Sequence, residues 1–109
     1  MKGIMIKETE QDIQKAISDY LEYSGFLVVK INNVGIMKLN GQYIPPRQKG
    51  ISDLICCKGG KFYAFEVKTS KGKISDHQQE FLDSVLRVGG IGIVVRSIDD
   101  VKKIIKQKL

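Results

Sequence analysis

The feature that most restricts the fold of this chain is a Gly59-Gly60 pair between two short apolar segments, LICCK and KFYAFEV. Two adjacent glycines accept the backbone angles of a two-residue turn, so the pattern predicts a β-hairpin that closes at this pair. Its register places Asp53 opposite Glu66, and Lys68 emerges on the same face of the second strand. The turn therefore predicts that two carboxylates and one ammonium group lie together.

Two acids that face each other within apolar strands repel, and a cation between them is the simplest way to remove the repulsion. Oxygen ligands without histidine favour Mg²⁺ or Mn²⁺, and Mg²⁺ completes its shell with water and substrate phosphate. Asp53 and Glu66 therefore predict metal-dependent chemistry on a phosphate ester, in which Lys68 orients the nucleophile or neutralises developing charge. The alternative is an ordinary salt bridge from Lys68 to one of the acids. The apolar neighbours favour the metal site, because an unpaired charge there is costly.

The rest of the pattern predicts one α/β domain over residues 1–109. The expected elements are a helix over about 9–23, a strand over 26–31, a hairpin over 36–44 with Asn40-Gly41 at its centre, a second hairpin over 53–68, a helix from Ser75 to Gly89, a strand over 91–96 and a final helix from about Ser97. This order, α-β-β-hairpin-β-β-α-β-α, gives a mixed β-sheet flanked by helices.

The chain has 18 Lys and Arg against 12 Asp and Glu, a formal charge of +6 that suits a polyanion or an anionic membrane surface. The sequence contains neither a long apolar run nor an apolar segment near the N-terminus, so we expect a cytoplasmic protein that does not enter a membrane. The neighbouring Cys56 and Cys57 point to opposite faces of a strand, which argues against a disulfide and predicts buried, reduced thiols.

Two motifs resemble a known nuclease signature. Gly50-Ile51-Ser52-Asp53 followed by Glu66-Val67-Lys68 is similar to the PD-(D/E)xK pattern, with serine where the pattern has proline. Glu10, Asn32-Asn33 and Ser75-Asp76-His77-Gln78 extend the resemblance over most of the chain to the virus-type replication-repair nuclease (VRR-NUC) domain. The resemblance implies a restriction-endonuclease-like sheet and metal-dependent cleavage of DNA. Standalone bacterial and phage domains of this kind are similar to archaeal Holliday junction resolvases and tend to be homodimers.

The resemblance also implies roles for six residues. Asp53, Glu66 and the backbone carbonyl of Val67 would ligate the metal, and Lys68 would be the catalytic lysine. Glu10 would approach the metal directly or through water. Gln78 would position the lysine or the substrate.

Three of the polar residues near the helix starts have a simpler interpretation. Glu10 is an acid in a first helical turn, where it complements the helix dipole. Gln78 follows Ser75 by three residues, so the pair also forms a capping box. For His77, a solvent-facing position is favoured over a role as general base.

Polar residues in the loops beside the second hairpin are candidates for contact with nucleic acid. They are Arg47, Lys49, Lys71, Lys73, Asn32 and Asn33. Their alternative is solvated loop charge or, for the asparagines, a simple turn.

The leading hypothesis is a Mg²⁺- or Mn²⁺-dependent DNA endonuclease acting on branched DNA such as Holliday junctions. The alternatives are a non-catalytic nucleic-acid-binding module with a nuclease-like fold and an archaeal-type Holliday junction resolvase. An exposed hairpin at Ile36 to Ile44 suggests a homodimer.

Overall fold

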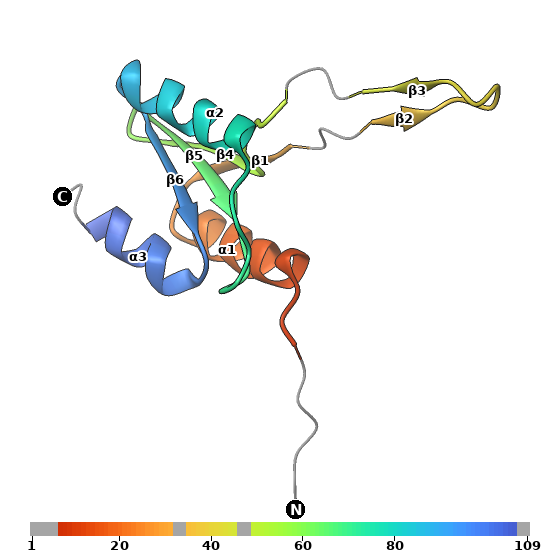
Figure 1. Cartoon of the computed structure of the whole chain (residues 1–109). Coiled ribbons are helices and arrows are strands. Elements are labelled where there is room, and N and C mark those ends of the chain that lie inside the picture. The colour runs from red at the N-terminus through yellow and green to blue at the C-terminus, as the bar shows by residue number, and fades with distance from the viewer. Residues whose placement is uncertain (1–6, 32–34, 46–48, 107–109) are drawn as a thin grey trace, which may run out of the picture.

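The computed structural model describes residues 7–31, 35–45 and 49–106, and Figure 1 shows their arrangement. The elements follow the expected order. They are α1 (Glu10–Tyr23), β1 (Leu27–Lys30), β2 (Ile36–Met37), β3 (Tyr43–Ile44), β4 (Leu54–Lys58), β5 (Lys61–Val67), α2 (Asp76–Arg87), β6 (Ile91–Val95) and α3 (Ile98–Lys106).

The main sheet has four strands in the order β1-β4-β5-β6. Strands β1, β4 and β5 are antiparallel neighbours, whereas β6 runs parallel to β5 after the crossover through α2. Helices α1 and α3 pack on one face of the sheet and α2 packs on the other (Figure 1). This arrangement confirms the predicted mixed β-sheet flanked by helices.

Side-chain alternation along β5 decides which residues enter the core. Tyr63, Phe65 and Val67 point toward α1 and α3 and join the larger apolar cluster. Ala64 points the other way and packs under α2. Glu66 shares the direction of Ala64, so the strand places a carboxylate against the helix that begins after Ser75.

The hairpin between β4 and β5 has the predicted register, with Lys58 opposite Lys61 and both turn glycines at positive φ, 60° and 77°. The turn between β2 and β3 differs from the expectation. Gly41 N–H donates to the carbonyl of Lys38, so Leu39 and Asn40 are the central residues and Gly41 follows at φ 88°. Among the described residues only glycines have positive φ, so Asn40 does not take the mirror-image turn that an Asn-Gly centre favours.

The prediction for the two cysteines is half correct. Both thiols are free and point to opposite faces, but only Cys56 is buried and Cys57 is exposed. The reason is that α2 does not extend over the β1 side of the sheet, where Leu27 pairs with Cys57 and is exposed as well.

Candidate active site

The structure brings Asp53 and Glu66 together at the open end of the β4–β5 hairpin. The last ladder pair is Leu54 with Phe65, so Asp53 and Glu66 occupy the next positions of the same register. Asp53 Oδ2 accepts a hydrogen bond of 2.8 Å from the backbone N–H of Val67. The backbone carbonyl of Asp53 accepts another, of 2.9 Å, from Ile31 N–H after β1. Val67 therefore fixes the carboxylate of Asp53, and Ile31 fixes its backbone.

Glu66 is the most buried charged side chain of the described residues, with 1% of its surface exposed. Its Oε2 accepts a 3.0 Å hydrogen bond from Gln78 Nε2 and lies 3.8 Å from Lys68 Nζ. Burial and, after it, the negative charge of the nearby Asp53 raise the pKa of Glu66 from 4.5 to about 8, against the opposing effect of Lys68. The structure therefore stabilises the protonated form of a carboxylate whose one ion pair, among the described residues, is with Lys68.

The second oxygen of Glu66 is the feature that bears on metal binding. Oε1 is buried and has no hydrogen-bond partner within the described part of the chain. Residues 7–31, 35–45 and 49–106 contain no group of three or more His, Cys, Asp or Glu side chains able to hold an ion. Two carboxylates are nevertheless sufficient for Mg²⁺, which keeps several waters, whereas protein Zn²⁺ sites use three or four protein ligands that typically include His or Cys. Asp53 and Glu66 therefore fit a hard divalent cation.

Lys68 directly follows β5, and its position depends on the loop that comes after it. Its backbone N–H donates to the carbonyl of Val95, and its side chain, 13% exposed, lies against Gly72, where an added Cβ would be 3.4 Å from Lys68 Cβ and Cδ. Arg96 Nη1 donates to the carbonyls of Thr69 and Gly72, at 2.6 and 2.7 Å. Arg96 therefore ties the loop beside Lys68 to the end of β6.

Besides contacting Glu66 with its side chain, Gln78 forms the capping box that its sequence position predicts. Its Oε1 accepts from Ser75 N–H at 2.9 Å while its own backbone N–H donates to Ser75 Oγ, which completes a capping box. The remaining amide group, Nε2, is then directed at Glu66. Because capping fixes the rotation of the amide, Gln78 presents a donor to the carboxylate.

Gly50 holds the start of α2 next to the β4–β5 hairpin that carries the two carboxylates. Its φ is +80°, and an added Cβ would lie 2.1 Å from the carbonyl oxygen of His77 and 2.7 Å from the backbone nitrogen of Gln78. Only glycine permits this approach of the two backbones. The roles of Gly50 and Arg96 were not predicted from the sequence; for Gly50 the available signal was a glycine three residues before Asp53.

Glu10 is the first residue of α1 and is exposed. The N-terminal cap of α1 is formed by Thr9 and Asp12, so Glu10 takes no part in the capping box. It lines an open pocket of about 550 Å³ together with Asp53 and Lys30, and its charge adds to the raised pKa of Glu66. Glu10 thus lies near the carboxylates without joining them in a three-ligand group.

Three of the residues predicted to contact nucleic acid belong to the described part of the chain. Lys49, Lys71 and Lys73 are exposed, and so is His77, as expected. Arg47, Asn32 and Asn33 lie outside the described residues.

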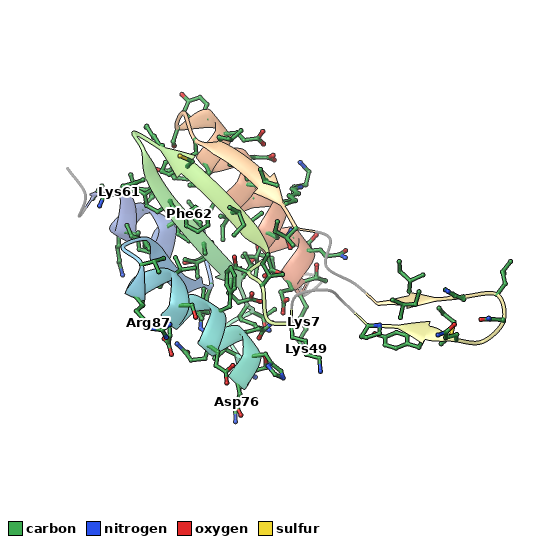
Figure 2. All side chains as sticks on the ribbon, turned by 90° about the horizontal axis from the view of Figure 1, so that it is seen from above. Lys7, Lys49, Lys61, Phe62, Asp76 and Arg87 are labelled. Atoms are coloured by element: carbon green, nitrogen blue, oxygen red, sulfur yellow. The ribbon has the colours of Figure 1, made fainter. Side chains whose placement is uncertain are left out.

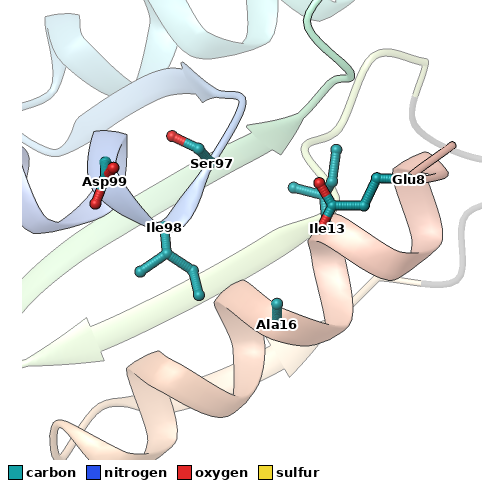
Figure 3. A pocket seen from close by; sticks show the side chains of 6 residues that line it. All are labelled: Glu8, Ile13, Ala16, Ser97, Ile98 and Asp99. Atoms are coloured by element: carbon teal, nitrogen blue, oxygen red, sulfur yellow. The ribbon is translucent and has the colours of Figure 1, made fainter. Parts of the chain in front are cut away.

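Two further pockets lie near the start of α1. Lys71, Arg96 and Lys7 help to line a pocket of about 390 Å³ on the Lys68 side of the site. Figure 3 shows a smaller one of about 160 Å³, between the start of α1 and the start of α3. The acids Glu8 and Asp99 are part of its lining, so its charge does not suit a phosphate.

Comparison with known proteins was informative at the level of structure. No protein-family profile matches the sequence, and no curated protein matches it. Solved structures do match, including the following two. One, described as a VRR_NUC domain, is 25% identical with a TM-score of 0.65 and covers 91% of this chain and 97% of its own. The other, a VRR_NUC domain protein, is 18% identical with a TM-score of 0.63 and covers 94% of this chain and 88% of its own.

The chain resembles VRR-NUC domains over most of its length. Its mixed sheet of four strands and three helices has the fold of this nuclease family, as the resemblance of the two motifs implied. Among the described residues, no helix is long and apolar enough to span a membrane.

Proposed function

We propose that this protein is a Mg²⁺-dependent endonuclease that hydrolyses DNA phosphodiester bonds. The observation that carries the proposal is the buried Oε1 of Glu66, which has no partner among the described residues and lies beside a second carboxylate, Asp53. Burying a carboxylate without a partner costs free energy that a nearby divalent cation removes. Asp53, Glu66 and the backbone carbonyl of Val67 would hold the cation, with Mn²⁺ as a substitute.

When bound, such a cation polarises the phosphate and activates water for attack on phosphorus. The chain supplies the remaining groups. Lys68 has its ammonium beside Glu66 and is placed to donate to the phosphate or to the attacking water. Gln78 keeps Oε2 of Glu66 in place through its hydrogen bond. Glu10, across the open pocket from Asp53, is suited to act on the site through water.

The surplus of positive charge supports a polyanionic substrate, and the exposed Lys49, Lys71 and Lys73 are the proposed phosphate contacts. The similarity of standalone VRR-NUC domains to archaeal Holliday junction resolvases supports branched DNA as the substrate and a homodimer as the active form. Two active sites in one dimer would suit the symmetric strands of a junction. We place this activity in the cytoplasm of a bacterium or of a phage-infected cell.

The alternative, a binding module without catalytic activity, is not favoured by the burial of Glu66. A domain that only binds DNA gains nothing from two facing acids, because apolar residues of similar volume in such positions are often neutral or stabilising.

The experiment is cleavage of labelled four-way junction, splayed-arm, duplex and single-stranded DNA in Mg²⁺, Mn²⁺ or EDTA. We expect cutting that requires the divalent cation, is abolished by Lys68→Ala and is retained by Lys61→Ala. Lys61 is a matched control because it is an exposed lysine at the opposite end of β5 (Figure 2). Equal DNA binding by wild type and Lys68→Ala with no cutting of any substrate would refute the nuclease and favour the binding module.

A further inference from the structure

The β2–β3 hairpin, residues 35–45, is the most exposed apolar segment of the structure, and we refer to it as the arm. Figures 1 and 2 show it extending away from the four-stranded sheet. All of its large apolar side chains are exposed: Ile36, Met37, Leu39, Tyr43 and Ile44. Leu39, at the turn, is fully exposed. Apolar side chains gathered in this way indicate an interaction surface.

The tip of the arm is held in one conformation by its own hydrogen bonds. Lys38 N–H donates to the carbonyl of Gln42 at 2.8 Å, and Gly41 N–H donates to the carbonyl of Lys38 at 2.9 Å. Asn40 Oδ1 accepts from Gln42 N–H at 3.0 Å. Leu39 is therefore presented on a preformed turn, so that little conformational entropy is lost when the tip binds.

The charge around the arm selects the kind of partner. Residues 31–52 contain no Asp or Glu, while Lys38 lies beside the apolar tip and Lys49 follows the arm in the chain. Two such arms brought together would add like charges with no acid to balance them. A polyanion that also offers apolar surfaces matches both the lysines and the leucine, and nucleic acid offers phosphates and base faces together.

The chain on both sides of the arm is attached to the candidate active site. Before the arm, Ile31 N–H donates to the backbone carbonyl of Asp53. After it, Gly50 packs against the peptide between His77 and Gln78. A ligand bound at Asp53 and Glu66 is therefore next to the segment that carries the arm, which favours the substrate of that site as its partner.

We propose that the arm binds the same DNA as the active site, with Leu39 inserted between neighbouring bases as an apolar wedge and Lys38 on an adjacent phosphate. Insertion of an apolar side chain unstacks a base step and kinks the duplex. This inference rests on the proposed function in its choice of DNA. It adds a device that would favour branch points, where bases are already poorly stacked and the cost of insertion is lowest.

The test uses the full chain in EDTA with a four-way junction that carries 2-aminopurine at one position at a time, because this base fluoresces more strongly when unstacked. We expect the wild type to raise the fluorescence at one or two positions near the branch, and Leu39→Ser to abolish the increase. Val88→Ser is the matched control, an exposed aliphatic residue at the far end of α2 from Gln78, and it should behave as the wild type. An equal increase for wild type and Leu39→Ser, or none for the wild type, would overturn the proposal.

A second measurement examines Lys38 through the salt dependence of junction binding. Lys38→Gln should reduce the slope of log K against log salt by about one, and the exposed control Lys61→Gln should leave it unchanged. Equal slopes for Lys38→Gln and wild type would refute the phosphate contact.

Two other partners would give different results. Loss of binding to phosphatidylserine vesicles in Leu39→Ser, with DNA binding intact, would replace the proposal with a membrane contact. A change in sedimentation from dimer to monomer in the same variant, with unstacking intact, would replace it with a contact between two copies. Because unstacking is read without a divalent cation, a wild type that unstacks the junction but never cuts it would refute the nuclease and leave the wedge standing.

Discussion

Replacing Glu66 by glutamine should stabilise the protein in the absence of a divalent cation while it abolishes DNA cleavage. Glutamine has the shape of glutamate, and its carbonyl oxygen can accept the hydrogen bond from Gln78 that Oε2 of Glu66 now accepts. The substitution removes the negative charge that burial and Asp53 make unfavourable. The residue that the proposed activity needs most is thus the one whose charge destabilises the metal-free fold.

The magnitude and its sign follow from the pKa of Glu66. The folded protein keeps the proton up to about pH 8, whereas the unfolded chain releases it near 4.5, so the folded state binds more protons between these values. The free energy of unfolding therefore falls as pH rises from about 4.5 to 8. Each pKa unit corresponds to about 1.4 kcal/mol, so the loss by pH 7 is on the order of 3 kcal/mol. Glu66→Gln should not show this loss.

The assay is urea denaturation in EDTA from pH 4.5 to 9, with wild type, Glu66→Gln and the exposed control Glu80→Gln. We expect Glu66→Gln and wild type to be similar near pH 4.5 and the variant to be more stable by about 3 kcal/mol at pH 7. Glu80→Gln should follow the wild type at every pH. A wild type whose stability does not fall over this range, or a Glu66→Gln variant less stable than wild type at pH 8, would refute the reasoning.

Three further predictions address the groups around the carboxylates. Mg²⁺ or Mn²⁺ should raise the melting temperature of the wild type and not that of Glu66→Gln, as measured by thermal scans with and without the cation; an equal rise would place the cation elsewhere. Gly50→Ala should lower the free energy of unfolding, measured in urea, by at least about 2 kcal/mol, because the added Cβ would meet the His77 carbonyl. The control Gly41→Ala, with φ 88° and open space around it, should lower it by about 1 kcal/mol. Equal losses would show that the close approach at Gly50 is unimportant. Arg96→Gln should slow single-turnover cleavage by about tenfold or more and leave stabilisation by Mg²⁺ unchanged. The reason is that the variant releases the loop beside Lys68 and does not disturb the carboxylates. An unchanged cleavage rate would exclude a positioning role for Arg96.

The register of the β4–β5 hairpin was predictable because local chemistry decides it. Two glycines with positive φ set the turn, and the period of two along a strand then carries the register to Asp53 and Glu66 without further information. The same alternation assigned Glu66 to one face of the sheet. What covers that face was not predictable from the hairpin, since it depends on the crossover through α2.

Contacts between distant segments account for what the sequence could not supply. Arg96 reaches the carbonyls of Thr69 and Gly72 from the end of another strand, and nothing in the residues around it indicates that partner. The capping box of Gln78 was predictable from its spacing to Ser75. Its hydrogen bond to Glu66 was not, because only the packing of α2 brings its amide to that side chain. The central residues of the turn in the arm lie one position earlier in the chain than the predicted Asn40-Gly41 pair, since Gly41 is the only described residue there with positive φ.

The central claim is that Asp53 and Glu66 together hold the divalent cation on which DNA cleavage depends. The most direct test is single-turnover cleavage of a four-way junction over a range of Mg²⁺ concentrations by wild type, Asp53→Asn and the exposed control Asp83→Asn. We predict saturable, Mg²⁺-dependent cutting by wild type and Asp83→Asn, and loss of at least a hundredfold in rate for Asp53→Asn, on the order of the effect of removing one catalytic electrostatic group. Cleavage by Asp53→Asn at the wild-type rate and with the same Mg²⁺ dependence would contradict the claim.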